Sequence, residues 1–197
     1  MNKDSDSPKI RTFIAIPLPP AVTVELRKLI SQLRSLSQGV RWVNPGSIHL
    51  TLKFLGSLST AELSKVFRGM ENIFQNSPAS FQLTAAELGA FPSLKRPRVL
   101  WVGVAGSGME SLIGLQQLIE EEMVKQGFSK EERKFSPHLT LARIKYANHL
   151  TELIQAFSGY NFPAVEFTVS DILIMRSDLR PEGAVYSIQQ KFPLSLE

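Results

Sequence analysis

The chain has 197 residues, which is enough to bury a sizeable core in one large domain or in two small lobes. It contains no cysteine, and this excludes disulfide bonds, thiolate metal sites and cysteine nucleophiles. The net charge of +4 favours anionic partners such as nucleic acid or nucleotides, although charge alone fits many proteins.

The sequence carries no signal for a membrane or for export. No apolar run reaches the roughly 18 residues of a membrane span. Residues 1–10 are mostly polar and hold no apolar signal-peptide core. We therefore expect a cytoplasmic protein without a membrane partner, with a flexible N-terminal tail at 1–10 and a single bilobal domain at 11–197.

The first half of the chain alternates between strand-like and helix-like segments. Ser59 and Glu62 form a capping-box pattern, which predicts the start of a helix, and Gly56 predicts the end of the strand before it. In chain order we expect a strand at 11–18, a helix at 20–36, an extended piece at 40–43, a strand at 48–55, a helix at 60–74, and strands at 80–88 and 98–104.

The second half shows the same kinds of segment in a similar order. Gly127 predicts the end of a helix, and either Asn148 or Thr151 is expected to cap a later, shorter helix. In chain order we expect a helix at 109–126, a strand from 138, a helix around 153–157, and strands at 166–175 and 184–192 that a loop at 177–183 connects.

One tetrapeptide, His-Leu-Thr-Leu, occurs twice, at 49–52 and at 138–141. Apolar and polar residues alternate in it with period two, as in a β-strand that buries one face. Each strand then buries its leucines and presents a histidine and a threonine on its other face. Because the chain has only three histidines, two of them in matching positions indicate a pair that works together.

The two tetrapeptides lie 89 residues apart, and other elements repeat at the same spacing. The helix at 20 maps to the helix at 109, and the strand at 98 maps to a strand near 187. The order of elements therefore predicts an internal repeat, about 20–104 and 109–192. We expect an α+β fold of two antiparallel-type sheets, with helices on their outer faces and the two histidines facing each other across a central cleft.

Two facing imidazoles suit displacement at phosphorus. Imidazole titrates near neutral pH, so one ring can activate a water or hydroxyl while the other protonates the leaving oxygen. Thr51 and Thr140 can each donate a hydroxyl hydrogen bond to a phosphate oxygen. This chemistry needs no metal and no cofactor, and it predicts His49 and His138 as the catalytic residues.

Other interpretations of the same residues are open at this point. A histidine in a strand is often only a structural hydrogen-bond partner, and a duplicated binding module needs no catalysis. Zinc usually takes three or four protein ligands, and no acidic residue lies beside either histidine. The third histidine, His149, has no repeated counterpart, and we expect it at the surface. The chain also lacks the phosphate-loop, dinucleotide-binding and nucleophile-elbow motifs.

The two motifs and their flanks resemble a known family. His-Leu-Thr-Leu, followed once by Lys-Phe-Leu-Gly and once by Ala-Arg, resembles the paired H-x-T-x motifs of the two-histidine phosphoesterase superfamily. The likeness extends over 11–16, 41–43, Phe91 with Pro92, 98–102 and 180–186. More narrowly, the sequence resembles the bacterial and archaeal RNA 2′,3′-cyclic phosphodiesterases, also called 2′-5′ RNA ligases.

This resemblance implies metal-independent hydrolysis of an RNA 2′,3′-cyclic phosphate to a 2′-phosphomonoester, with possible reversible 2′-5′ RNA ligation. It implies His49 and His138 as the acid–base pair, Thr51 and Thr140 as phosphate-binding hydroxyls, and Arg143 as a phosphate contact. The expected partner is RNA with a cyclic phosphate end, such as a tRNA fragment, or a small cyclic nucleotide. We expect a monomer. The alternatives are a non-catalytic RNA- or nucleotide-binding module and a phosphodiesterase for a different cyclic or 2′-5′-linked nucleotide.

The residues next to the motifs are assigned by strand alternation. Alternation places Lys53 on the histidine-bearing face, where it would add positive potential to the substrate site, with a solvated surface charge as the alternative. It places Arg143 on the leucine face, so Arg143 reaches the cleft only if the strand twists, bulges or ends near Ala142.

Aromatic and basic side chains near the motifs are candidates for RNA binding. Phe54 and Trp42 are candidates to stack a base, with a position in the core as the alternative. A basic loop and its flank supply three further candidates for RNA backbone contacts, which are Lys95, Arg96 and Arg98.

Overall fold

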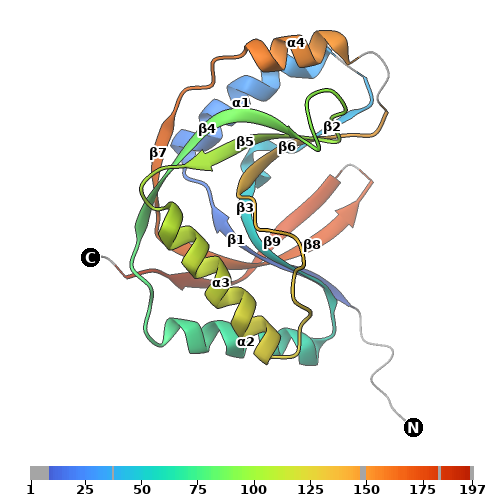
Figure 1. Ribbon diagram of the computed structural model, residues 1–197. Coiled ribbons are helices and arrows are strands. Elements are labelled where there is room, and N and C mark those ends of the chain that lie inside the picture. Colours follow the sequence, from blue (N-terminus) through green and yellow to red (C-terminus); the bar gives the residue numbers. More distant parts are fainter. Residues whose placement is uncertain (1–8, 37, 147–149, 182, 196–197) are drawn as a thin grey trace.

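The computed structural model describes residues 9–36, 38–146, 150–181 and 183–195 (Figure 1). His149 and Asn148 lie outside these ranges. The helices are α1 (Pro20–Leu33), α2 (Thr60–Phe74), α3 (Met109–Lys125) and α4 (Thr151–Gly159), with 3-10 turns at Arg34–Leu36 and Pro45–Ser47. The strands are β1 (Ile10–Pro17), β2 (Val40–Trp42), β3 (His49–Leu58), β4 (Phe81–Phe91), β5 (Val99–Ala105), β6 (His138–Ile144), β7 (Val165–Val169), β8 (Asp171–Arg180) and β9 (Gly183–Pro193).

The nine strands of the described residues form one curled antiparallel sheet in the order β7-β4-β5-β6-β3-β1-β8-β9, with β2 paired to β6. The two histidine strands, β6 and β3, are the central neighbours. They pair through Leu50 and Leu139, the first leucines of the two motifs. On either side of this pair the sheet has two halves of four strands, β6-β5-β4-β7 and β3-β1-β8-β9. The predicted α+β class is confirmed, and the two predicted sheets are joined into one at the motifs.

Helices cover the outer surface of each half (Figure 1). Helices α2 and α3 pack against each other and against β1, β3 and β9, whereas α1 and α4 contact each other and the strands β7 and β4. Their buried faces hold the apolar residues that recur at helical spacing, for example Val22, Leu26, Leu29 and Leu33 of α1. No helix within the described ranges is long and apolar enough to cross a membrane.

The capping predictions have different outcomes in α2 and α4. The side chain of Ser59 accepts a hydrogen bond from the backbone of Glu62, and the Glu62 carboxylate accepts one from the backbone of Ser59, so the predicted capping box is confirmed. Helix α4 begins after Leu150, which provides no side-chain cap, so the proposed cap by Thr151 is wrong.

The last strands differ most from their prediction. The expected strand at 166–175 is broken at Ser170 into β7, which pairs with β4, and β8, which pairs with β1. One residue thus connects opposite halves of the sheet, and this is possible only because the sheet curls. The expected loop at 177–183 is mostly strand, since β8 continues to Arg180 and β9 begins at Gly183.

Two further expectations are corrected by the strand pairing. Strand β3 continues past Gly56 to Leu58. Its pairing with β1 leaves out Leu55 as an extra residue, and Gly56, with φ of +80°, follows directly. The glycine therefore belongs to a β-bulge within the strand and does not end the strand. In addition, β5 does not correspond to β9. Strand β5 lies directly beside the histidine strand β6, as β1 lies beside β3, whereas β9 is the outermost strand of its half.

Candidate functional site

The two motif strands reach the centre of the sheet with the same division of faces. Leu50, Leu52, Leu139 and Leu141 are buried in the core. The histidines and threonines of the motifs are half-buried and lie on the opposite face, which we call the histidine face. Strands β3 and β6 run antiparallel, and Leu50 lies opposite Leu139. In this register each motif histidine lies across from the threonine of the other motif.

Each motif strand contains a β-bulge directly after its threonine. In β3, Thr51 pairs with Ala15 and Lys53 with Ile14, so Leu52 is the extra residue. In β6, Thr140 pairs with Trp101 and Ala142 with Leu100, so Leu141 is the extra residue. Two consecutive residues therefore point into the core in each strand, and the next residue returns to the histidine face.

The bulges reverse the positions that strict alternation predicts for the next two residues. Arg143 is exposed on the histidine face, in line with His138 and Thr140, because the strand bulges next to Ala142, which is one of the conditions predicted from the sequence for this placement. Phe54 takes the matching place in β3, and 59% of its surface is exposed. It is a surface aromatic beside the motif. Trp42, by contrast, packs against the core.

Lys53 does not lie on the histidine face, and that prediction is corrected. Its side chain is buried, and its Nζ lies 2.7 Å from Glu120 Oε1 of α3. The same Nζ donates a hydrogen bond to the backbone oxygen of Ser129 at 3.1 Å, and Glu120 Oε1 also accepts one from the backbone of Glu131. Lys53 thus fixes α3 and the loop that leads to the second motif, and it supplies no charge to the histidine face.

Both imidazole rings are held in one orientation by a backbone carbonyl. His49 Nδ1 lies 2.9 Å from the oxygen of Ser47, and His138 Nδ1 lies 2.7 Å from the oxygen of Ser136. A carbonyl oxygen only accepts, so Nδ1 carries the hydrogen and donates it in both rings. In the neutral ring Nε2 therefore keeps a lone pair, which can take a proton from a substrate or return one to it.

The surroundings lower the pKa of both histidines. Burial lowers the pKa of His49 below its usual value, against the smaller opposing effect of the hydrogen bond to Ser47. Burial also lowers the pKa of His138, and the positive charge of Arg143 lowers it further, while the hydrogen bond to Ser136 raises it. This effect of Arg143 agrees with its position on the same face of the sheet as His138.

Aromatic side chains surround the two imidazoles, and no sequence pattern assigned them this place. Phe13 stacks on His49 with ring centroids 4.6 Å apart, and Tyr186 meets the same imidazole edge-on at 5.1 Å. Phe91 meets His138 edge-on at 4.9 Å. These contacts account for part of the burial that lowers the histidine pKa values. Phe91 and Tyr186 belong to segments of the family resemblance, which was the only signal for them.

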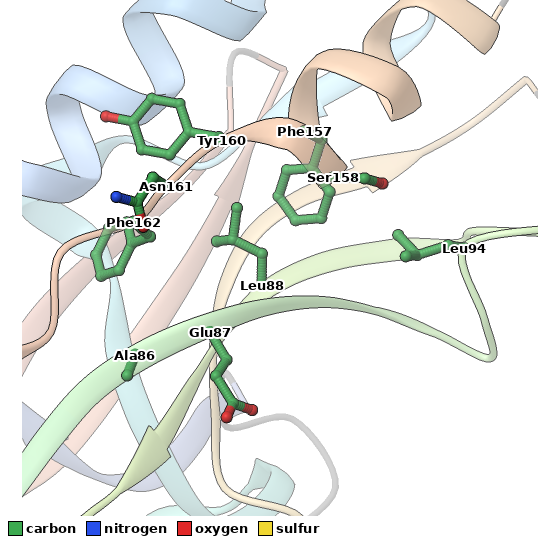
Figure 2. A pocket seen from close by; sticks show the side chains of 9 residues that line it. All are labelled: Ala86, Glu87, Leu88, Leu94, Phe157, Ser158, Tyr160, Asn161 and Phe162. Atoms are coloured by element: carbon green, nitrogen blue, oxygen red, sulfur yellow. The ribbon is translucent and has the colours of Figure 1, made fainter.

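A pocket of about 530 Å³ lies elsewhere, between residues 86–88 of β4, where the pairing with β5 is shifted by a bulge, and the end of α4 (Figure 2). Its lining includes Leu88, Phe157 and Phe162, and its only charged side chain is the carboxylate of Glu87. None of the predicted site residues lines it. A lining that holds a carboxylate and no cationic side chain does not suit an anionic phosphodiester. The basic candidates Lys95, Arg96 and Arg98 are exposed in or beside the loop between β4 and β5.

Metal ligation has little support from the arrangement of side chains. Within the described ranges, no three histidine, aspartate or glutamate side chains gather closely enough to hold a metal ion. The polar groups that follow the two histidines along their own strands on this face are the hydroxyls of Thr51 and Thr140 and the guanidinium of Arg143.

Comparison with known proteins gives a consistent result. The model of the LigT-like phosphoesterase family matches the chain twice, at residues 16–101 and 102–186. An RNA 2′,3′-cyclic phosphodiesterase of Thermotoga maritima is 33% identical over 91% of this chain and 92% of its own length. Another, from Methanothermobacter thermautotrophicus, is 31% identical over 94% of this chain and 100% of its own length.

Solved structures support the fold. TT0787 of Thermus thermophilus superposes with a TM-score of 0.70 at 29% identity, over 93% of this chain and 97% of that protein. E. coli LigT, solved in complex with 3′-AMP, gives a TM-score of 0.70 at 22% identity, over 95% of this chain and 99% of LigT. The likeness to LigT concerns the fold alone.

Proposed function

The chain belongs to the LigT-like phosphoesterase family, and we propose that it hydrolyses the 2′,3′-cyclic phosphate at the end of an RNA to a 2′-phosphomonoester. The observation that carries this proposal is the duplicated imidazole geometry. Each motif histidine donates from Nδ1 to a backbone carbonyl, and this frees Nε2 for proton transfer. The relatives named as RNA 2′,3′-cyclic phosphodiesterases cover nearly the whole chain and support the same reaction.

In the proposed reaction, one neutral imidazole takes a proton from water as the water oxygen bonds to phosphorus. The bond between phosphorus and the 3′ oxygen breaks on the opposite side, and the second imidazole, in its protonated form, gives its proton to that oxygen. The products are a 2′-phosphomonoester and a free 3′ hydroxyl. Proton exchange with water then restores the two histidines for the next turnover.

The other residues of the histidine face are assigned to substrate binding. The hydroxyls of Thr51 and Thr140 donate hydrogen bonds to non-bridging phosphate oxygens. The guanidinium of Arg143 offsets the negative charge that these oxygens carry in the transition state. Phe54, which is exposed on the same face, stacks against the base of the terminal nucleotide. Lys53 has no role in binding, because its charge is already paired with Glu120.

The proposal includes a metal-free mechanism, since two imidazoles supply both proton transfers. It also includes a reversible ligation, in which the 5′ hydroxyl of a second RNA takes the place of water, the bond between phosphorus and the 3′ oxygen breaks as before, and a 2′-5′ linkage forms. We further propose one bilobal domain over 11–197 with an internal repeat, and a monomeric cytoplasmic enzyme. The two matches of the family model support the repeat.

The test is to incubate the protein with adenosine 2′,3′-cyclic phosphate in the presence of EDTA and to separate the products by chromatography. We expect adenosine 2′-phosphate and no 3′ isomer. A non-catalytic binding module would bind the nucleotide and leave it unchanged. Formation of the 3′ isomer, or loss of turnover with EDTA that added metal restores, would contradict the proposed mechanism.

A further inference from the structure

Two arginines face each other across neighbouring strands beside the second motif. Arg41 of β2 and Arg143 of β6 are direct partners in the antiparallel register, so their side chains share one face. The bulge at Leu141 makes this the histidine face. Strand β2 lies along the same edge of β6 as β3 does, further along the strand. A line of cationic groups therefore runs from Arg143, beside His138, outward to Arg41.

This arginine pair, Arg41 and Arg143, is exposed, and no acid among the described residues neutralises it. Neither guanidinium forms an ion pair or a side-chain hydrogen bond with another residue in the described part of the chain. Like charges directly opposite each other on antiparallel strands destabilise the pairing. No described acid offsets this repulsion, and a bound anion would offset it. A phosphate group matches a guanidinium well, because two N–H groups of the guanidinium can donate to two oxygens of the same phosphate at once.

Arg41 also stands where the two halves of the sheet approach each other. A Cβ atom built on Gly183, the first residue of β9, would lie 3.8 Å from Nη2 of Arg41. The guanidinium thus reaches from β2 to the β8–β9 hairpin, which belongs to the other half. Any chain that leaves the histidine face along this edge of β6 passes Arg41.

The matching position in the first motif differs in chemistry, and this indicates the direction in which a bound RNA chain continues. Phe54 occupies in β3 the place that Arg143 occupies in β6, and it offers an exposed aromatic ring in place of a charge. An aromatic surface suits a base, whereas phosphates need the cationic side. The two halves therefore define a polarity for a bound RNA end.

We propose that Arg41 binds the phosphate that links the last two nucleotides of the RNA substrate, so that the enzyme prefers oligoribonucleotide ends to mononucleotides. This inference rests on the proposed function. The terminal base lies on Phe54, the cyclic phosphate lies between the histidines and beside Arg143, and the chain continues over β2 past Arg41.

The experiment compares kcat/KM for adenosine 2′,3′-cyclic phosphate with kcat/KM for a short oligoribonucleotide that ends in the same group. For Arg41→Gln, the ratio of oligonucleotide to mononucleotide activity should fall about tenfold, as expected for one charge-assisted phosphate contact. The salt dependence of the oligonucleotide reaction should weaken by a slope of about 0.7. Arg41→Lys keeps the charge but not the paired donors, so it should keep the salt slope and give a ratio between those of the wild type and Arg41→Gln.

The matched control is Arg68→Gln, which removes an equal charge from an exposed position on α2. It should leave both the ratio and the salt slope unchanged. The inference is overturned if Arg41→Gln leaves the ratio at its wild-type value, or if Arg68→Gln lowers it equally. A loss of structure in Arg41→Gln would appear as a lowered melting temperature. In that case the Arg41→Lys variant, if it melts like the wild type, tests the contact without the loss of structure.

A binding measurement separates failure of this inference from failure of the proposed function. Fluorescence anisotropy of a labelled oligoribonucleotide with a 3′-phosphate end requires no turnover. If the wild-type protein hydrolyses neither substrate, the proposed function fails, and the anisotropy still decides the role of Arg41. Affinity that Arg41→Gln lowers about tenfold, with the salt slope reduced, supports the contact. Equal affinity of the variant and the wild type overturns it.

Discussion

The two motif strands, β3 and β6, have the same backbone arrangement and differ in the side chains that come after the bulge. Both begin with a histidine whose Nδ1 donates to the carbonyl two residues before it, and both bulge after the threonine. The residue that turns inward is Lys53 in one strand and Ala142 in the other. The residue that returns outward is Phe54 in one strand and Arg143 in the other.

This difference separates chemistry from recognition. Proton transfer needs two equivalent groups, and the duplicated geometry supplies them. A phosphodiester in an RNA is not symmetric, because a base lies on one side of it and a charged chain continues on the other. An aromatic ring in one half and a guanidinium in the other match that asymmetry. Substitutions can test first the features that the halves share and then the features that distinguish them.

The largest expected effect comes from removing either histidine. His49→Ala and His138→Ala should each lower kcat by roughly 10²–10⁴-fold, the range of general acid–base catalysis. Because the two rings act as a unit, the double variant should be little worse than either single variant. Steady-state kinetics with a cyclic mononucleotide measures this. Near wild-type kcat in one single variant would show that the halves are not equivalent.

The buried ion pair in the first half predicts a loss of stability. Lys53→Met leaves the Glu120 carboxylate buried without its counter-charge, which costs roughly 3–5 kcal/mol in the free energy of unfolding. Lys53→Met with Glu120→Gln should recover most of this, since the amide oxygen still accepts from the Glu131 backbone. Urea-induced unfolding measures both variants.

The control for this pair is Lys125→Met, which removes an exposed partner of Glu122 and should change the free energy of unfolding by about 0.5 kcal/mol or less. If Lys53→Met and Lys125→Met lower the free energy of unfolding equally, the ion pair between Lys53 and Glu120 does not stabilise the contact between β3 and α3.

Removal of the guanidinium in the second half should change both rate and pH dependence. Arg143→Gln should lower kcat/KM by roughly 10–100-fold through the lost charge-assisted contact. The charge of Arg143 lowers the pKa of His138, so its removal should raise that pKa and move one limb of the bell-shaped pH profile to higher pH.

Which limb moves identifies the role of His138. A shift of the acidic limb marks His138 as the base, and a shift of the alkaline limb marks it as the acid. If neither limb moves, the guanidinium does not act on the second imidazole in solution. Arg143→Lys keeps the charge and should keep both limbs in place.

The smallest effect is expected from the aromatic position in the first half. Phe54→Ala should raise KM about tenfold for a cyclic mononucleotide through the lost stacking with the base. The value of kcat and the pH profile should stay close to wild type, because Phe54 carries no charge. Phe54→Trp should restore KM. A fall in kcat without a change in KM would contradict the role in base binding.

Much of the fold followed from local patterns in the sequence. The period-two alternation predicted both motif strands, the helical spacing of Val22, Leu26 and Leu29 predicted α1, and the capping box predicted the start of α2. The joining of two sheets through Leu50 and Leu139 did not follow, because strand pairing depends on contacts distant in sequence. For the same reason the break between β7 and β8 was missed.

The site followed from the sequence only as far as the regular strand continues. His49, Thr51, His138 and Thr140 come before the bulges, and their faces agree with alternation. Lys53 comes after a bulge, and its prediction was wrong, because one extra residue moves every later side chain to the other face. Nothing in the local composition marks the bulge, and the buried partner of Lys53 comes from α3, 67 residues later.

The central claim is that two imidazoles with the same tautomer act on one phosphate. Long-range ¹H–¹⁵N correlation spectra of the histidines, recorded during titration with adenosine 2′-phosphate, test it most directly. We predict that both His49 and His138 carry hydrogen on Nδ1 in the free protein, and that one saturable binding event shifts both Nε2 resonances with a single Kd. Hydrogen on Nε2 in either neutral ring, or a response of only one of the two rings, would contradict the account.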